Sequence, residues 1–307
     1  MKIATIIPCL GRPEETLACL KSLAEDGVPP GTVTVVENGT RENQERLQPL
    51  FPLVAFIRLP RNEGFAAACN LGARDAGRRL DPDFFFFLNN DARVGKDSLA
   101  ALASALRTDS KAGLAAPKIL SGEDGRIWAA GGEVAGWKLF ARNRGRDQKD
   151  TGLYDRAEEM AFLSGCALMI RAEAGRSLGF FDERFFAYAE DLDLCLRARK
   201  AGWKLLYRPE SVVFHKGSAT AGDQYGPFQS FYRWRNRLLV FSKHARLPRK
   251  LFLYFIFFPA LALRDLAVYL RKRPESIPYL WKGFLQFLSL AVLGKNPEPF
   301  RSAGGKG

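Results

Sequence analysis

The residues best suited to chemistry in this chain are two amides and a carboxylate in a row, Asn89, Asn90 and Asp91. They follow five large apolar residues, 84–88, which are typical of a strand buried on both faces of a parallel sheet. Sheets of this kind bind ligands at the carboxyl ends of their strands. Asp91 could bind a divalent cation there, and the amides could hydrogen-bond a sugar or a phosphate. The same tripeptide is common in turns, so the motif alone leaves both interpretations open.

Three earlier loops carry residues of similar chemistry, each directly after a predicted strand. Glycine in such a loop lets a ligand approach the backbone, and the start of the following helix favours anions. Each loop alone is weak evidence, because Asn-Gly is a common turn and Asn62 could merely cap a helix. Together they indicate a ligand site at one edge of the sheet. Its candidates are Pro8 and Leu10 at the end of the first strand, Glu37 and Asn38 at the end of the second, and Asn62, Gly64 and Asn70 after the third.

Two phosphate-binding patterns are missing from the sequence. No Gly-x-Gly-x-x-Gly follows the first predicted strand, and there is no Gly-x-x-x-x-Gly-Lys-Ser/Thr. A dinucleotide-binding fold and a P-loop are therefore disfavoured.

Further candidates lie in the second half of the chain. Glu190 and Asp191 begin a predicted helix, whose positive end stabilises an ionised carboxylate. Acidic residues are also ordinary in a first helical turn, but the aromatic residues upstream would shield this carboxylate from water. His215 follows a short predicted strand. A lone His is more often structural, and this one becomes a candidate ligand only because a metal-binding aspartate is already suspected.

Alternating strands and helices must position these residues. Strands are predicted at 2–8, 32–37, 54–59 and 84–88, with helices at 14–25, 42–50 and 64–79 between them. This order predicts an α/β fold with a mostly parallel central sheet and helices on both faces. Farther along, helices are predicted at 98–107 and 190–201, and strands at 113–119, 160–170, 204–207 and 212–215.

The composition is that of a folded globular protein, with 307 residues, 47% of them hydrophobic and 26% charged. Five cysteines lie far apart and form no Cys-x-x-Cys pair, which favours reduced, buried thiols in a cytoplasmic protein over disulfides. The first residues run directly into a predicted strand, without a signal peptide before it. We expect a domain at 1–225 that carries the site, a basic and apolar helical segment at 226–300, and a disordered tail at 301–307.

The charge is concentrated near the carboxyl end. Residues 228–274 contain eleven Lys or Arg and a single acid, Asp265, and so supply +10 of the net charge of +13. Within them, 251–263 is uncharged, which is shorter than the roughly 20 apolar residues of a spanning helix. We therefore expect amphipathic helices, here and at 277–293, on an anionic membrane surface. Packing on the main domain or in a homodimer is the alternative, and the apolar neighbours disfavour nucleic acid.

In their order along the chain, these motifs resemble those of family 2 inverting glycosyltransferases with the GT-A fold. The resemblance covers roughly residues 1–220 and is closest to the bacterial rhamnosyltransferase and galactofuranosyltransferase branch. It rests on Pro8, Glu37-Asn38, Asn62-x-Gly64-Phe65 with Asn70, Asn89-Asn90-Asp91-Ala92, Phe181-Asp182-Glu183-x-Phe185-Phe186, Glu190-Asp191-x-Asp193-x-x-x-Arg197 and His215.

The resemblance implies a GT-A, Rossmann-like domain that binds a nucleotide sugar, followed by the C-terminal amphipathic helices. It implies that Asp91 and His215 hold a divalent cation, Mn²⁺ or Mg²⁺, which neutralises the leaving diphosphate. It makes Asp191 the general base for an acceptor hydroxyl that attacks opposite the leaving group, so that configuration inverts. Asn89 and Asn90 would bind the ribose or sugar of the donor, and Gly165 would lie beneath the sugar. Glu37 and Asn38 would contact the nucleobase and ribose. The loop on the nucleobase side would contribute Asn62, Gly64 and Asn70.

Two positions depart from the family pattern. Many relatives have Asp where this chain has Glu37, which leaves uridine and thymidine both open as the base. The metal motif begins with Asn89 rather than Asp, which leaves fewer carboxylates for the cation.

The implied reaction is transfer of L-rhamnose from dTDP-rhamnose to a polyprenyl-diphosphate-linked glycan, in cell-surface polysaccharide synthesis. The enzyme would be peripheral on the inner face of the plasma membrane. Transfer of galactofuranose or a hexose from a UDP-sugar is the first alternative. A non-catalytic module that binds a sugar nucleotide or glycan is the second. A sugar-1-phosphate nucleotidyltransferase is disfavoured, because Gly11-Arg12 is a poor match to its Gly-rich basic loop.

Overall fold

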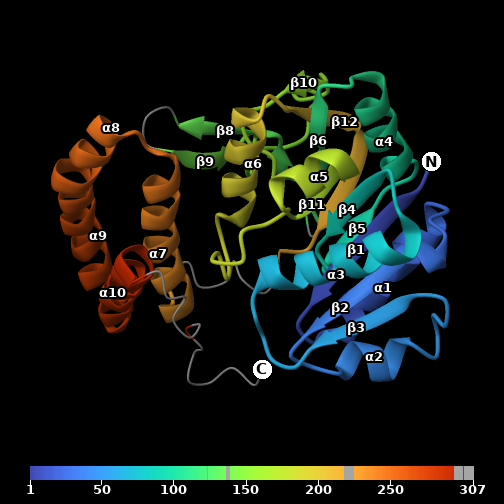
Figure 1. Ribbon diagram of the computed structural model, residues 1–307, viewed down its shortest axis with the longest axis horizontal. Helices are drawn as coiled ribbons and strands as arrows, with labels where there is room; N and C mark the ends of the chain where they lie inside the picture. The colour runs from blue at the N-terminus through green and yellow to red at the C-terminus, as the bar shows by residue number, and fades with distance from the viewer. Residues whose placement is uncertain (123, 136–138, 218–224, 294–299, 301–307) are drawn as a thin grey trace.

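The structure is a computed structural model that describes residues 1–122, 124–135, 139–217, 225–293 and 300. It has an α/β body built around a curled sheet, with the C-terminal helices grouped beside it (Figure 1). The tail predicted to be disordered, 301–307, lies outside the described residues.

The first four strands form the parallel centre of the sheet. They are β1 (Ile3–Cys9), β2 (Val33–Asn38), β3 (Ala55–Leu59) and β4 (Phe84–Leu88), and they lie in the order β3-β2-β1-β4. The chain winds one way from β1 to β3 and the other way to β4. The carboxyl ends of β1 and β4 therefore form a switch point, where open α/β sheets bind ligands. The predicted α/β fold with a mostly parallel centre is confirmed.

The other half of the sheet is mixed. β11 (Ala167–Arg171) runs antiparallel between β4 and β6 (Ala112–Ser121), whereas β12 (Lys204–His215) is parallel to β6. The strands predicted at 204–207 and 212–215 are one strand, β12, with a register shift between Arg208 and Val212. The strand predicted from residue 160 begins only at Ala167. The short strands are β5 (Ala92–Val94), β7 (Ile127–Ala130) and β10 (Glu158–Glu159) in this sheet, and β8 (Gly132–Ala135) with β9 (Phe140–Asn143) in a second one.

Helices cover both faces of the sheet. Phe85 and Phe87 share a core with α3 (Phe65–Leu80), α5 (Ala172–Leu178) and α6 (Glu190–Lys200). The side chains of 84, 86 and 88 enter a second core with α1 (Pro13–Glu25) and α4 (Ser98–Thr108). Alternate side chains of a strand point to opposite faces, which explains why all five residues of β4 are apolar. The remaining helix of this region, α2 (Glu42–Leu47), packs beside α1.

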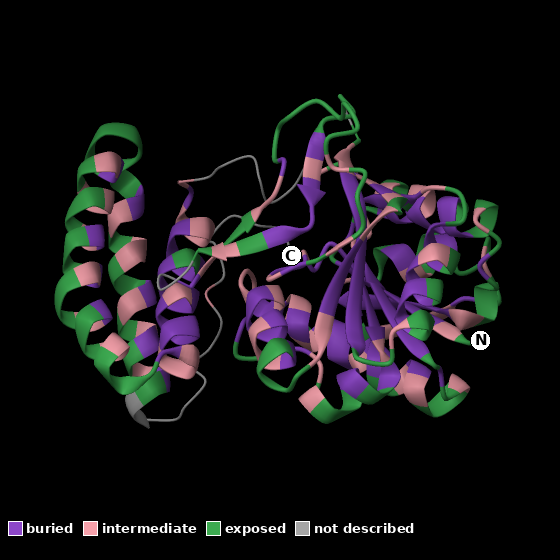
Figure 2. Cartoon of the chain, turned by 90° about the horizontal axis from the view of Figure 1, so that it is seen from above, coloured by how far each residue is buried: buried purple, intermediate pink, exposed green. Residues whose placement is uncertain are grey.

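The C-terminal helices differ in burial. α7 (Pro227–His244) is largely buried between the body and α10 (Ile277–Leu293). Between them, α8 (Leu247–Phe252), a π-helical turn (Leu253–Phe257) and α9 (Phe258–Lys272) form one helical stretch, followed by a short turn (Pro274–Ser276). Figure 2 shows how exposed the outer helices are compared with the interior of the body. Among the described residues, the 26-residue stretch Leu247–Lys272 is the one helix long and apolar enough to cross a membrane, by length and composition alone.

Candidate active site

Asp91 and His215, the two predicted metal ligands, lie side by side at the carboxyl end of β4. β5 follows directly and pairs antiparallel with the end of β12, which places Ala92 opposite His215. The Nε2 atom of His215 is 3.1 Å from Asp91 Oδ1 and 3.3 Å from the side-chain nitrogen Nδ2 of Asn89. The side chains of His215 and Asp91 are only 7% and 13% exposed. Strand pairing thus joins two residues that are far apart in the sequence.

Each member of this pair stabilises the charged form of the other. Burial lowers the pKa of His215, but Cys166 and Asp91 outweigh burial and raise that pKa to about 10. Burial raises the pKa of Asp91, but the hydrogen bond and charge of His215 outweigh it and hold the pKa below its ordinary value. A carboxylate oxygen and a neutral imidazole nitrogen that converge on one point form a donor set suited to Mn²⁺ and acceptable to Mg²⁺, so a bound cation would take the place of the proton on His215. The residues therefore fit a divalent cation. No cluster of three or more His, Cys, Asp or Glu within the described ranges could hold one alone.

Asp191, the predicted base, is connected to the same strand end through backbone contacts. Its Oδ2 accepts a hydrogen bond from the Gly165 N–H at 3.0 Å, and its Oδ1 accepts one from its neighbour Leu192 at 2.8 Å. The next carbonyl along, that of Cys166, accepts a hydrogen bond from the Asn89 N–H at 2.9 Å. The backbone of 165–166 therefore links Asp191 to the loop that carries Asp91.

The two adjacent carboxyl groups of α6 differ in their surroundings. Burial raises the pKa of Asp191, and the N–H groups of Gly165 and Leu192 offset part of that rise. Burial and then the charge of Asp191 raise the pKa of Glu190 to about 8. Two neighbouring carboxyl groups in a buried site do not readily ionise together. Asp191 has the hydrogen bonds that stabilise a carboxylate, so at neutral pH it carries the charge and Glu190 keeps its proton.

The residues predicted to lie on the nucleobase side of the donor join two loops to each other. Asn38 donates a hydrogen bond to the Gly64 carbonyl at 3.1 Å and accepts one from the Glu63 N–H at 2.9 Å. Asn62 accepts a hydrogen bond from the Gly64 N–H at 3.0 Å. Gly64 has φ 91°, and a Cβ there would lie 2.3 Å from the carbonyl oxygen of Phe186. Only glycine fits this contact between the loop before α3 and the loop before α6.

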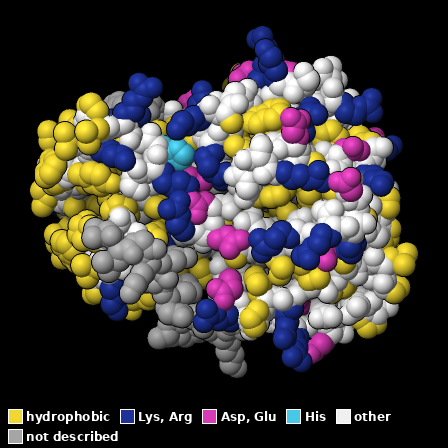
Figure 3. Space-filling model, viewed as in Figure 1, with side chains coloured by type: hydrophobic (Ala, Val, Ile, Leu, Met, Phe, Trp, Pro, Cys, Tyr) yellow, Lys and Arg dark blue, Asp and Glu magenta, His cyan; other side chains and the backbone are white. Residues whose placement is uncertain are grey.

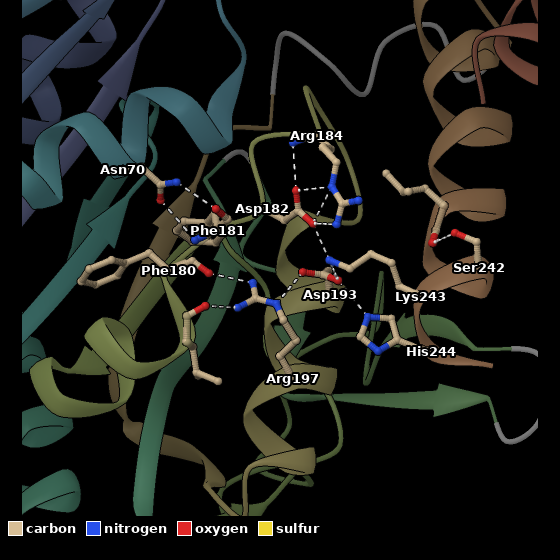
Figure 4. Close-up of polar contacts among 12 residues, drawn as sticks. Asn70, Phe180, Phe181, Asp182, Arg184, Asp193, Arg197, Ser242, Lys243 and His244 are labelled. Carbon is tan, nitrogen blue, oxygen red and sulfur yellow. Dashed lines mark hydrogen bonds and ion pairs between the residues drawn. The ribbon is translucent and has the colours of Figure 1, made fainter. Parts of the chain in front are cut away.

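Two other predicted donor contacts are engaged inside the protein. Glu37 is fully buried, and its carboxylate accepts hydrogen bonds from the Gln44 N–H at 2.8 Å and from the Thr40 hydroxyl. Asn70 donates to the Phe181 carbonyl at 2.8 Å and accepts from its N–H at 3.1 Å (Figure 4). These bonds hold the loops at 39–44 and 181–183. Contact of either residue with a nucleotide stays a prediction, and it would require the exchange of an internal hydrogen bond.

The remaining predicted contacts lie near the carboxyl ends of β1 and β4. Pro8 is buried within β1, whereas Leu10 directly after the strand is 41% exposed. Asn90 donates a hydrogen bond to Thr16 Oγ1 at 3.1 Å, which ties its loop to α1. The structure thus brings Asn89, Gly165 and Asp191 together with the Asp91–His215 pair, and keeps Glu37 and Asn70 inside.

Sequence reasoning missed the contribution of α7. Asn236 is 1% exposed, and its amide donates to the carbonyls of Ala187 at 2.6 Å and Tyr188 at 2.8 Å. Tyr188 and Ala189 have φ 69° and 68°, uncommon values for residues with side chains. Asn236 therefore stabilises a strained turn directly before the helix that carries Asp191. The signal that could have revealed it is an Asn on the apolar face of an amphipathic helix, four residues from both Tyr232 and Val240, because a buried amide needs partners.

A buried charge network fixes α6 against α7. Asp193 of α6 is fully buried, and its carboxylate lies 2.5 Å from Lys243, 2.8 Å from His244 and 2.7 Å from Arg197 (Figure 4). Lys243 also contacts Asp182. Burial raises the pKa of Asp193, but the hydrogen bond with His244 and the charges of Arg197 and Lys243 outweigh burial and lower that pKa. The network ties three segments together next to the candidate base.

A cavity of about 410 Å³, which we call the α7 cavity, lies beside Asp191. Its other lining residues include Arg233, Asn236 and Arg237 of α7 and Phe140 of β9. Sites for small ligands commonly have about 300–1,000 Å³. A larger depression of about 750 Å³ beside α2 contains none of the predicted site residues, so we assign the site to the strand ends and the α7 cavity.

Several curated proteins are similar to this chain in sequence. The N-acetylglucosaminyl-diphospho-decaprenol L-rhamnosyltransferase of Mycobacterium tuberculosis H37Rv is 29% identical over 215 residues, which are 63% of this chain and 69% of that protein. The pre-mycofactocin glycosyltransferase of the same organism is 29% identical over 162 residues, 53% of this chain and 32% of that protein.

Solved structures share the fold at low identity. TarS 1-349 of S. aureus in complex with UDP-GlcNAc has a TM-score of 0.57 at 16% identity, covering 95% of this chain and 82% of that one. The mannosyltransferase PcManGT of Pyrobaculum calidifontis, with GDP-Man and Mn²⁺, has a TM-score of 0.55 at 16% identity over 94% and 87%. GalNAc-T7 with UDP, GalNAc and Mn²⁺ has a TM-score of 0.56 at 16% identity, and the match covers 85% of this chain and 57% of that one.

A family model decides the assignment. The model described as Glycosyl transferase family group 2 matches residues 84–296, well over half of the chain, and spans β4, Asp91, Asp191, His215 and the C-terminal helices. The chain belongs to this family and is a glycosyltransferase with the GT-A fold.

Proposed function

We propose that this enzyme transfers L-rhamnose from dTDP-rhamnose, with inversion, to a glycan carried on a polyprenyl diphosphate. The observation that carries the proposal is the backbone link from Asp191 through 165–166 to Asn89, which connects the proposed base to the proposed cation site. The choice of sugar and acceptor is supported by the M. tuberculosis relative, whose name states both.

The cation side of the site is Asp91 with His215. Structural neighbours with Mn²⁺ support a divalent cation here, and the remaining ligands would be diphosphate oxygens and water. When bound, the cation supplies positive charge that stabilises the departing nucleoside diphosphate. The protein's own part is to hold a carboxylate and an imidazole 3.1 Å apart. Asn89 and Asn90 would orient the donor, and Gly165 would leave room beneath the sugar.

Asp191 performs the proton transfer in this proposal. It accepts the proton of an acceptor hydroxyl while that oxygen bonds to the anomeric carbon, and the bond from this carbon to the diphosphate oxygen breaks on the opposite face. The proton ends on Asp191 and the electron pair on the nucleoside diphosphate. Hydrogen bonds from Gly165 and Leu192 keep the carboxylate oriented and leave lone pairs free for the acceptor.

Residues 226–300 would hold the enzyme at the anionic inner face of the membrane, next to the catalytic domain of 1–225. Hydrophobic side chains gather over α8–α10, with Lys and Arg among them (Figure 3). Exposed examples are Phe255 at 75%, Ile256 at 59% and Trp281 at 59%. Arg264 and Asp265 end the uncharged run within the helix of 247–272, so this run stays below the roughly 20 residues needed for spanning. This pattern favours contact at the interface, and a homodimer through the same face is the competing outcome.

The test is a donor panel with the full-length protein. dTDP-rhamnose, UDP-galactofuranose and UDP-hexoses are each incubated with Mn²⁺ or Mg²⁺ and a synthetic N-acetylglucosaminyl-diphospho-lipid, and products are weighed by mass spectrometry. The proposal predicts a deoxyhexose product from dTDP-rhamnose. Products from UDP-sugars alone would favour the UDP-sugar transferase, which Glu37 at the base position leaves open. Donor binding without transfer to any acceptor would favour a binding module.

A further inference from the structure

The α7 cavity contains two arginines that the reaction at Asp91 and Asp191 does not use. Arg233 and Arg237 are four residues apart and so lie on one face of α7. Arg233 is exposed and forms no hydrogen bond or ion pair with another residue of the described ranges. Arg237 is half-buried, and its nearest carboxylate, that of Asp265, is 3.7 Å away.

Arg233 therefore brings to the cavity a positive charge that no described carboxylate pairs with, whereas Arg237 forms an ion pair with Asp265. Burial lowers the pKa of Arg237 to about 10, which still leaves it charged at neutral pH. A guanidinium donates two parallel hydrogen bonds to phosphate oxygens, and a pair of them matches a diphosphate. The donor's own diphosphate would lie at Asp91 and His215, so an anion in the α7 cavity belongs to the second substrate.

The cavity also leads to the apolar helices. Phe140, which lines it, has its ring centre 6.1 Å from that of Phe257 and 5.9 Å from that of Phe241. Phe257 ends the π-helical turn between α8 and α9, where Phe255 and Ile256 are exposed. A ligand with a sugar near Asp191 and an anionic group near α7 could therefore extend an apolar tail along this helix.

We propose that Arg233 and Arg237 bind the diphosphate of the lipid-linked acceptor, with its sugar hydroxyl at Asp191 and its isoprenoid leaving past Phe140. The proposal rests on the proposed function and adds the acceptor site to it. Arg233 is the stronger candidate, because it has no competing carboxylate.

The test compares two acceptors in phospholipid-free detergent micelles. One is the N-acetylglucosaminyl-diphospho-lipid, and the other is N-acetylglucosamine on a neutral alkyl chain. Arg233→Gln should raise KM for the diphosphate acceptor at least about tenfold, as expected for loss of a charged hydrogen bond. It should leave KM for the neutral acceptor and for the donor within about twofold, and Arg233→Lys should restore part of the loss. Arg271→Gln, which removes an equivalent charge at the end of α9, is the matched control and should change neither KM.

The outcomes are distinct. Equal effects of Arg233→Gln on both acceptors, or none, would overturn the acceptor site. Weaker sedimentation with anionic vesicles but unchanged KM in micelles would assign Arg233 to phospholipid headgroups and also overturn it. Arg233 is exposed, so melting temperatures of the variants should match that of the wild type. Failure of the wild-type enzyme to use any diphosphate acceptor would instead remove the proposed function, and this site with it.

Discussion

Gly165 donates its backbone N–H to Asp191 Oδ2 over 3.0 Å, so the candidate base is oriented by main chain and not by another side chain. A Cβ on Gly165 would lie 3.2 Å from the Cβ of Asp191, which shows how close the two segments are. The chain that continues from Gly165 enters β11, which pairs with β4. The sheet itself therefore sets the position of the base relative to Asp91.

Replacement of Asp191 by Asn should abolish transfer and keep donor binding. Asn has the same shape but cannot accept the acceptor's proton, and loss of a general base typically costs about 10²–10⁴-fold in rate. The measurements are kcat from product formation and donor affinity from calorimetry. Glu173→Gln, an exposed change in the first turn of α5, is the control. Unchanged turnover in Asp191→Asn would exclude it as the base.

Replacement of Gly165 by Ala should lower kcat by about tenfold or more without loss of the fold. The added methyl group must push Asp191 by a few tenths of an ångström, and small misplacements of a reacting group are costly. Steady-state kinetics with a melting curve measure both effects. If kcat stays at the wild-type value, the position of Asp191 does not depend on this contact.

Sequence patterns predicted the parallel half of the fold well, for a physical reason. The run at 84–88 and the alternating helices reflect burial on two faces, which leaves a strong local signal. The antiparallel direction of β11 has no such signal, because it depends on which neighbours the strand pairs with.

The site was predictable in part. Asp91, His215 and Asp191 stand at strand and helix ends, where local sequence indicates function. Asn236 and the Asp193–Lys243 pair could not be placed, because their partners come from distant segments. The short uncharged run at 251–263 also led to too short a helix, since the helix continues through the flanking charged residues to Lys272.

Removal of the divalent cation should stop transfer, and Asp91→Asn should have the same effect. The pair of Asp91 and His215 provides only two protein ligands, so the cation should be lost readily to EDTA and restored better by Mn²⁺ than by Mg²⁺. Product formation measured before and after chelation checks this. Full activity in excess EDTA would show that the pair acts without a metal.

Replacement of Asn236 by Ala should reduce both stability and kcat. The carbonyls of Ala187 and Tyr188 would lose their amide partner, and each unsatisfied buried group costs about 1–3 kcal/mol. The turn before Asp191 would loosen, so kcat should fall more than donor affinity does. Urea unfolding and kinetics give the two values. Ser242→Ala on the same helix is the control, because within the described part of the chain its hydroxyl donates only to the Leu239 carbonyl. Equal effects of both variants would indicate a general weakening of α7.

Replacement of Glu190 by Gln should stabilise the protein at high pH. Its pKa is about 8 in the folded protein against an ordinary value of 4.5, chiefly because of burial. Between these values the folded state keeps a proton that the unfolded state releases. The contribution of Glu190 to the free energy of unfolding is therefore fully present below its ordinary pKa. As the pH rises, this contribution declines by up to about 1.4 kcal/mol per pH unit, until the pH passes the pKa of Glu190 in the folded protein. Gln cannot ionise, so the variant should lack this decline.

Melting temperatures at pH 5 and pH 9 test the prediction for Glu190. The melting temperature of the wild type should fall more from pH 5 to pH 9 than that of Glu190→Gln. Glu173→Gln should behave like the wild type. Parallel pH profiles for all three proteins would mean that Glu190 ionises as readily as an exposed residue.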